Sequence, residues 1–273
     1  MEGLYLYCIR EKTAEHSTFS IKGIDGKGEV FTLTHRELEA IVSKVSLEEF
    51  GSGEIQEKSQ EDLGWIKEKA LAHEKVIEEA MRNKDNVLSV IPMRFGTIFK
   101  EKTSLEKTLN EDYAKIKEVL DKIRGKQEWS LKVYLKDKQK FERAVKEKKE
   151  VIKEKEKEIA SLPEGMAFFM EEELKEVISK EMDRELKNIV DVLFESLKKK
   201  KTDSIRKKIL EKELTGRSEP MVLNAAYLIA EEKIENFKKE AEDLNQKIQV
   251  QGFYLEYGGP WPAYNFTQLE VEK

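Results

Sequence analysis

The sequence predicts an α+β protein with two domains, because strand-like segments alternate with long segments of helical periodicity. Its 273 residues are enough for one large or two ordinary domains. Hydrophobic residues make up 39% of the chain, enough for a packed core although 38% of the residues are charged. Gly125 follows a helical segment as a plausible C-cap. We therefore expect an N-terminal α+β domain at 1–125 and a C-terminal domain at 126–273.

In the first half, β-branched and alternating apolar residues predict strands at Leu4–Arg10, Val30–Leu33, Leu38–Val45 and Val87–Met93. Leu38–Val45 also fits a helix face, but its β-branched residues favour a strand. We expect Pro92 to end the fourth strand, because proline has no amide to donate. Apolar residues at three- and four-residue steps predict helices at Thr103–Arg124 and at Ser59–Arg82, the latter capped by Ser59 or Asp62.

The second half predicts strand, helix, an undetermined segment, strand, helix and strand. Its segments are Trp129–Leu135, a charged helix after a capping Asp137, the long helix Met170–Leu197, Ser204–Leu214, Met221–Ala230, Glu231–Ile248 and a strand at Val250–Tyr257. If Ser204–Leu214 supplies a strand, the order is βαββαβ, which is ferredoxin-like. We expect residues 144–160, which are mostly charged, to project into solvent or loop around the body. Lys198–Lys201 suits a helix C-terminus and needs no nucleic acid to explain it.

The C-terminal tail combines backbone constraint with large aromatic rings. Gly258–Gly259 permits a sharp turn, and Pro260 and Pro262 flank Trp261 and are expected to stop the strand. Two further rings follow, at Tyr264 and Phe266. Either this tail packs back on the body, or it contacts a partner.

A second unusual stretch, at Arg94–Phe99, places a permanent charge beside apolar residues, and Gly96 within it offers a tight bend. Two roles for Arg94 remain open: it pairs with a carboxylate inside the fold, or it recognises a ligand.

Composition argues against several classes of protein. Lys+Arg of 50 against Asp+Glu of 55 gives a net charge of −5, whereas a nucleic-acid-binding domain is normally basic. The single cysteine, Cys8, excludes an intramolecular disulfide and suits a reducing, cytoplasmic setting. We expect no secretory signal and no membrane span.

The sequence offers no convincing catalytic centre. The three histidines, His16, His35 and His73, are scattered, and Ile77 stands where a zinc-protease helix would need its second histidine. We interpret His73 as an ordinary helix residue. A phosphate-binding loop and a nucleophile elbow are also missing from the sequence. We therefore expect no enzymatic activity, no cofactor and no metal.

The two unusual stretches carry a family resemblance. VIPMRFGTIF at Val90–Phe99 and GGPWPAYNF at Gly258–Phe266 resemble the paired signatures of the gas vesicle protein F/L family. The resemblance extends to YLYCIR near the start and to MVLNAAYLIAEEKIENF, and it covers nearly the whole chain. The tail signature is the more specific of the two.

This resemblance implies an accessory protein of gas vesicle assembly, with two α+β domains, the C-terminal one ferredoxin-like. It implies a cytoplasmic or gas-vesicle location. It also implies contacts with the small hydrophobic shell protein and with other accessory proteins, as carrier, nucleation or structural component. The candidate partner-binding residues are Arg94, Phe95, Gly96, Thr97, Gly259, Pro260, Trp261, Pro262, Tyr264 and Phe266.

Two alternative functions remain open. One is an enzyme whose inter-domain cleft binds an anionic substrate through Arg94; a deep polar pocket containing Arg94 would favour it. The other is a helical adaptor in which Met170–Leu197 docks onto a partner helix; an exposed apolar face on that helix would favour it.

Overall fold

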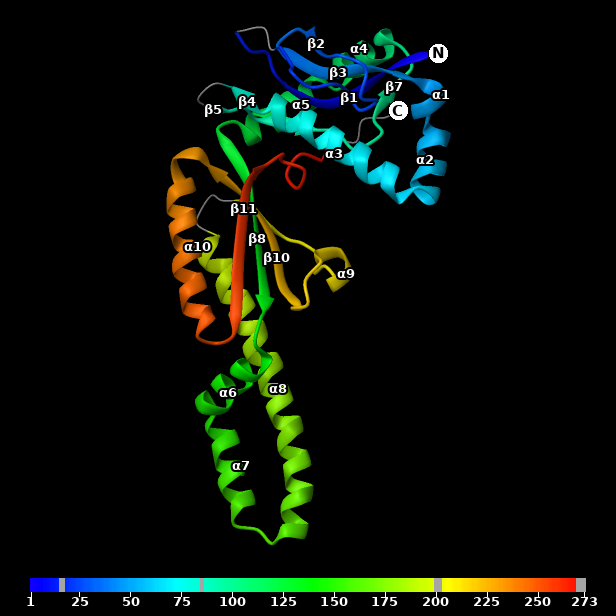
Figure 1. Ribbon diagram of the computed structural model, residues 1–273. Helices are drawn as coiled ribbons and strands as arrows, with labels where there is room; N and C mark the ends of the chain where they lie inside the picture. Colours follow the sequence, from blue (N-terminus) through cyan, green and yellow to red (C-terminus); the bar gives the residue numbers. More distant parts are fainter. Residues whose placement is uncertain (15–17, 84–85, 199–202, 269–273) are drawn as a thin grey trace. The chain divides into compact units, whose positions relative to one another are not determined.

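The chain is mixed helix and sheet, 51% helical and 27% strand, in the computed structural model of Figure 1. The structure describes residues 1–14, 18–83, 86–198 and 203–268; His16 and most of the Lys198–Lys201 run therefore lie outside the described residues. Two compact units emerge. Unit 1 comprises Met1–Glu128 with Pro260–Lys273, and unit 2 comprises Trp129–Gly259. The C-terminal tail thus groups with unit 1, whereas we expected it to belong to the C-terminal domain.

Unit 1 is built around strand β1 (Glu2–Glu11), whose residues Gly3–Arg10 are all buried. The sheet has the order β2-β3-β1-β6, and β7 also pairs with β1. The partners of β1 are antiparallel to it. The partners are β3 (Leu38–Ser46), β6 (Val90–Pro92) and β7 (Ile98–Phe99), and β2 (Val30–His35) pairs with the outer side of β3. Burial of consecutive residues along β1 means that both faces of the sheet are covered.

The helices of unit 1 provide this cover. Helix α3 contacts β1 and β6, while α4 contacts β2 and β7 and α5 contacts β6. The bounds are α1 (Leu47–Phe50), α2 (Ser52–Glu61), α3 (Leu63–Ala80), α4 (Lys102–Glu111) and α5 (Tyr113–Ile123), with a short strand pair at β4 (Arg82–Asn83) and β5 (Asn86–Val87).

Each helix predicted in unit 1 is in fact two. The first breaks at Asp62, which leaves helical geometry (φ −130°, ψ 88°) and caps α3 by accepting a hydrogen bond from the Trp65 amide at 2.9 Å. Leu63, predicted on the buried face, is consequently 78% exposed. The second breaks at Asp112. Periodicity missed both breaks, because one non-helical residue hardly disturbs a pattern of threes and fours.

Pro92 is the last residue of β6, as we predicted, and it still pairs with Cys8 of β1. This pairing is possible because β6 is the edge strand on this side of the sheet. A missing amide is tolerated on an edge strand when it faces away from the ladder.

The buried arginine of unit 1 is Arg10, on β1. Its guanidinium pairs with the Glu39 carboxylate at 2.9 Å and donates to the Ala80 carbonyl at 2.6 Å. Both side chains are almost wholly buried. The pair therefore joins β1 to β3 and to the C-terminal end of α3.

Unit 2 contains strands and helices in the order βαββαβ, with a sheet of order β11-β8-β10-β9. Its strands are β8 (Lys126–Leu135), β9 (Asp203–Arg206), β10 (Met221–Ala230) and β11 (Phe253–Trp261). The undetermined segment Ser204–Leu214 supplies most of β9 and then part of helix α9 (Lys212–Thr215). Alternate residues of β8, Trp129, Leu131 and Val133, join a core with residues of α8 (Glu164–Leu197) and α10 (Ile234–Gln249), the latter preceded by the 3-10 turn η1 (Glu231–Lys233).

The charged segment 144–160 is part of a helical arm (Figure 1). Helices α6 (Lys138–Lys148) and α7 (Glu150–Ala160) both pack against α8. Ile152 and Ile159 are buried in this contact. Glu181 and Glu185 of α8 pair with lysines at the α6–α7 junction; Lys149, for instance, lies 3.1 Å from Glu181. The segment therefore forms the end of α6 and all of α7, which pack against α8 in the arm.

Strand β11 continues through Gly258–Gly259 and Pro260 to Trp261, so the predicted sharp turn is absent and Pro260 does not stop the strand. The strand ends at Trp261, directly before Pro262. Because β11 is an edge strand of its sheet, it tolerates Pro260, which has no amide to donate. At the other end, Val250 lies outside the strand and is exposed.

We predict that Glu39→Gln lowers the free energy of unfolding by about 3–5 kcal/mol, because it leaves a buried guanidinium without its counter-charge. Urea denaturation measures the change. The matched control is Glu2→Gln, which removes the exposed Lys44–Glu2 pair (63% and 70% exposed) and should cost less than about 1 kcal/mol. Equal costs for the two variants would contradict the structural role of Arg10.

Candidate functional site

The loop between β6 and β7 contains the Arg94–Thr97 stretch singled out above. Strand β6 pairs with Cys8–Arg10 of β1, and β7 pairs with Leu4–Tyr5, so the loop leaves the sheet between them. Two backbone bonds pin its ends: Met93 N donates to Tyr7 O at 2.8 Å, and Leu6 N donates to Thr97 O at 2.9 Å. Gly96 has φ 81°, a left-handed conformation that favours glycine.

Hydrogen bonds with the Tyr5 and His73 side chains hold this loop in place. The Gly96 amide donates to the Tyr5 hydroxyl at 2.9 Å, and that hydroxyl lies 3.0 Å from His73 Nδ1. His73 Nε2 lies 3.2 Å from the Met93 carbonyl oxygen, which can only accept. Nε2 therefore carries the proton, and Nδ1 accepts from Tyr5. The His73 ring also packs edge-on against Phe95, with centroids 6.0 Å apart.

The C-terminal tail docks on the same residues. The Tyr264 hydroxyl donates to Glu74 Oε1 at 2.7 Å and lies 3.3 Å from His73 Nε2. Asn265 donates its backbone amide to Glu128 at 3.1 Å, and its side-chain amide contacts the same carboxylate. Phe266 is buried. The two stretches, about 170 residues apart in sequence, thus meet at His73 within unit 1.

Burial sets the protonation states of this cluster. Burial lowers the pKa of His73 to about 4, despite the opposing bond to Met93. Burial also raises the pKa values of Tyr5 and Tyr264 above the ordinary phenol value, and it raises the pKa of Glu74. At neutral pH the imidazole is neutral and both phenols keep their protons, which the hydrogen-bond directions above require.

The predicted site residues fall into exposed, buried and half-buried groups. Arg94, Trp261 and Tyr264 face solvent; the exposed fraction of Trp261 is 47%. Thr97, Pro262 and Phe266 are buried. Phe95, Gly96 and Gly259 are half-buried, and Pro260 is exposed. The first group is available to a partner, and the buried group anchors it.

Arg94 is exposed, and within the described part of the chain it makes no ion pair. Its carbonyl accepts from the Thr97 hydroxyl at 2.7 Å, which closes the turn. The buried, paired arginine is Arg10. Each comes at the end of an apolar run in the sequence, so only tertiary packing distinguishes them.

Sequence reasoning missed the residues that join the two stretches. His73 is not an ordinary helix residue; it is buried and has polar partners on both ring nitrogens. Tyr5, Glu74 and Glu128 were not singled out. The sequence of α3 did contain a signal for His73, which lies on the apolar face one turn before Ile77. A polar side chain on a buried face needs hydrogen-bond partners, so this position indicated a buried polar contact.

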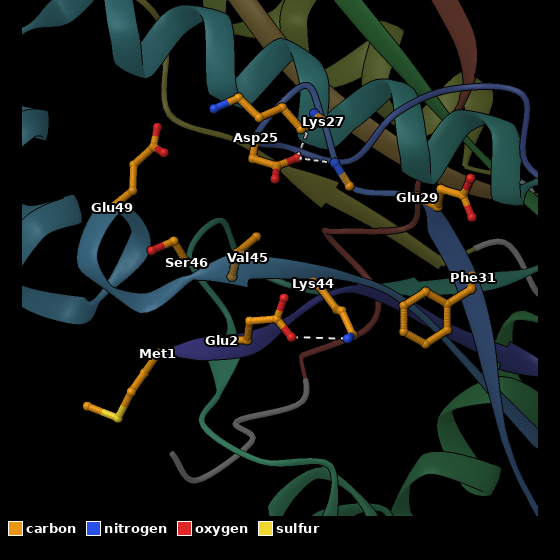
Figure 2. Close-up of a pocket in the computed structure, with 11 residues that line it drawn as sticks. Met1, Glu2, Asp25, Lys27, Glu29, Phe31, Lys44, Val45, Ser46 and Glu49 are labelled. Atoms are coloured by element: carbon orange, nitrogen blue, oxygen red, sulfur yellow. Dashed lines mark hydrogen bonds and ion pairs between the residues drawn. The ribbon is translucent and has the colours of Figure 1, made fainter.

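A hollow of about 750 Å³ lies elsewhere on unit 1, lined by residues that include Glu2, Asp25, Phe31 and Lys44 (Figure 2). Three of its polar side chains have partners within it: Lys44 pairs with Glu2 at 3.0 Å, and Asp25 accepts from the amides of Lys27 and Gly28. None of the predicted site residues lines it.

Among the described residues, no group of three or more His, Cys, Asp or Glu side chains is arranged to hold a metal ion. A separate search of the same residues finds no helix with both the length and the apolar character to cross a bilayer.

Neither alternative function, the enzyme with an anionic substrate or the helical adaptor, gains support from these features. Arg94 does not line the hollow of Figure 2, where an anion site would gain support. The apolar stripe of α8 faces the core of unit 2 through residues such as Leu174, Ile178 and Leu193, so it is not an open helix face.

These observations define a class: a mixed α+β protein whose distinctive residues form a braced, partly exposed turn and tail. Comparison with known proteins identifies the family. The family model described as "Gas vesicle synthesis protein GvpL/GvpF" matches residues 3–268. The chain belongs to this family, and its role is therefore in gas vesicle formation.

Relatives include both F and L proteins. The chain is 23% identical over 270 residues to gas vesicle protein F1 of Halobacterium salinarum, covering 99% of this chain and 95% of that protein. It is 24% identical to gas vesicle protein L1 of the same organism, covering 97% and 90%. The crystal structure of GvpF from Anabaena sp. PCC7120 matches with a TM-score of 0.73 at 22% identity, covering 99% and 100%, which shows a shared fold. Neither the family description nor these names mention an enzymatic activity.

We predict that acidification destabilises the protein through His73. The folded pKa is about 4 and the unfolded pKa about 6.5, so the unfolded state binds more protons between these values. The contribution is present above about pH 6.5 and is lost towards pH 4, about 3 kcal/mol in all. Urea unfolding of wild type and His73→Gln across this range measures it. The raised pKa of the neighbouring Glu74 changes stability with pH in the opposite direction. Glu74 is present in both proteins, so its contribution cancels in the comparison. The same pH slope in both would refute the assignment.

We predict that Phe266→Ala lowers the free energy of unfolding by about 3 kcal/mol, because it empties a buried site under the tail. Phe169→Ala is the matched control, since that ring is 73% exposed and its loss should cost less than about 0.5 kcal/mol. Thermal and urea denaturation provide the measurement. A tail that only touches partners would leave both variants as stable as wild type.

Proposed function

We propose that this chain is a non-enzymatic accessory protein of gas vesicle assembly that binds the small hydrophobic shell protein. It acts in the cytoplasm and at the gas vesicle, as carrier, nucleation or structural component, and it contacts other accessory proteins of the same assembly. Membership of the GvpL/GvpF family supports a role in gas vesicle formation. The finer role is our inference from the surface described above.

The contact surface we propose consists of Arg94–Thr97 and Gly259–Phe266. The observation that carries this assignment is the meeting of both stretches at His73, which braces exposed rings on a buried network. Pre-ordered aromatic and arginine side chains are typical of binding hot spots, because little entropy is lost when they are covered.

The chemistry of the client is consistent with such a surface. A shell protein with an apolar face exposes a large hydrophobic patch before assembly, and patches of this kind aggregate. A carrier with 38% charged residues stays dispersed while a few rings cover part of that patch. The exposed Arg94 adds a bidentate donor at the rim.

We also propose that the two units act as domains and that unit 2 is ferredoxin-like. Support comes from the βαββαβ order, with the last strand beside the first and the second strand at the far edge of the sheet. The long arm of α7 and α8 is an elaboration of the first βαβ crossover.

We predict that Trp261→Ala and Arg94→Gln each weaken capture of the shell protein about tenfold without unfolding the chain, as loss of a hot-spot side chain does. Pull-down of co-expressed shell protein by the tagged, full-length chain is the measurement. Leu63→Ala is the matched control, because Leu63 is an exposed apolar residue of unit 1 outside the proposed surface. If intact protein captures no shell protein, the function is wrong; if Leu63→Ala loses as much capture, the surface is wrong.

A further inference from the structure

The tip of the helical arm exposes a cluster of large apolar side chains. Met166, Phe168 and Phe169, at the start of α8, are 59%, 62% and 73% exposed. The two phenyl rings pack edge to face with centroids 6.0 Å apart, so they form one surface. In Figure 1 this tip lies at the end of the α7–α8 hairpin farthest from the unit 2 sheet.

The tip is also acidic. Residues 158–174 contain Glu158, Glu164, Glu171, Glu172 and Glu173 and no lysine, arginine or histidine. Elsewhere lysine and glutamate are closely interspersed, so this stretch is distinctive. Lys175 pairs with Glu172 at 2.6 Å. Glu164, Glu171 and Glu173 are exposed on the same first turns of α8 as the apolar cluster. The surface therefore suits a partner that is both basic and apolar.

A surface of that chemistry lies on the same unit. Ile205, Ile209 and Leu214 are exposed, Leu214 by 73%. They are interspersed with exposed cations at Arg206, Lys207, Lys208 and Lys212 and with two exposed carboxylates, Glu211 and Glu213, so the segment keeps a formal charge of +2. We call residues 205–214 the basic strip. Across the described part of the chain, Lys207, Lys208 and Lys212 have no carboxylate within ion-pair distance.

The basic strip is held in place at the edge of a sheet. It begins in β9, an edge strand of unit 2. Lys207 N donates to Asn224 O at 2.7 Å, and the Asn224 side chain donates to Lys208 O at 2.9 Å. The outer edge of β9 is a further docking element, because an edge strand presents free backbone groups.

One chain cannot bring these two surfaces together. Arg206 pairs with Asp191 of α8 at 2.7 Å, which places the start of the strip beside that residue. Phe169 lies about six turns, or about 33 Å, earlier on the same helix. A straight helix keeps the tip away from its own strip, so their complementarity can be satisfied only between chains.

We propose that the arm tip of one copy docks onto the basic strip of a second copy. The phenyl rings cover Ile209 and Leu214, and the tip carboxylates face Lys207 and Lys208. Because the two surfaces differ, the contact is head-to-tail and repeats along a row of copies, closing into a ring or extending as a chain. An anionic membrane is a poor occupant, since the acidic tip would be repelled by it.

Disulfide trapping between two full-length variants tests the contact. One population carries Phe169→Cys and the other Ile209→Cys, so any mixed dimer joins two chains. The natural cysteine, Cys8, is completely buried and leaves the new thiols as the reactive ones. The control partner is Val250→Cys, another exposed apolar position of unit 2. We expect several-fold more mixed dimer with position 209 than with position 250. Equal yields, no dimer, or tip-to-tip dimers of Phe169→Cys alone would overturn the proposal.

A charge-reversal experiment gives an independent readout in sedimentation analysis. Lys207→Glu/Lys208→Glu should abolish the rise in mean mass with protein concentration. Mixing it with Glu171→Lys/Glu172→Lys should restore pairwise association, because opposite charges face each other again. These positions are exposed, and circular dichroism checks that the variants are folded. No concentration-dependent association of wild type, or no rescue by the mixture, would overturn the proposal.

Discussion

The neutral imidazole of His73 is the interaction on which unit 1 depends. It accepts from Tyr5 on one side and donates to the Met93 carbonyl on the other, and Tyr264 reaches it from the tail. Strand β1, helix α3, the loop after β6 and the C-terminal tail therefore share one buried polar cluster. Such a cluster stabilises a single arrangement only when every member has a partner, because each unpaired buried group is costly.

Edge positions in the two sheets explain how the site is exposed. Pro92 lies on the edge strand of unit 1, and Pro260 lies on an edge strand of unit 2. Neither residue could sit in a central strand, where its missing amide would break the ladder. The chain leaves the ladder just after each proline, first into the Arg94 turn and then into the tail. The same residues that limit pairing thus supply the constrained loops that we propose contact a partner.

Charge is distributed to match these roles. Unit 1 buries the ion pair Arg10–Glu39 and carries its exposed rings on a braced turn and tail. Unit 2 has a highly charged arm, in which lysine and glutamate are interspersed before the acidic tip. The proposed client surface and the proposed self-association surface therefore lie on different units and use different chemistry.

Local pattern was sufficient to identify most of the elements. Alternation and helical periodicity predicted strands at β1, β3 and β10 and helices at α8 and α10, because burial of one face repeats with the period of the element. The sequence alone also singled out both stretches of the candidate site. Tertiary structure decided the rest: the helix breaks at Asp62 and Asp112, the burial of Arg10 in place of Arg94, and the docking of the tail on unit 1 through His73. The helix breaks depend on the backbone conformation of a single residue, and the other features depend on contacts between residues far apart in the chain. A periodic sequence pattern records neither of these causes.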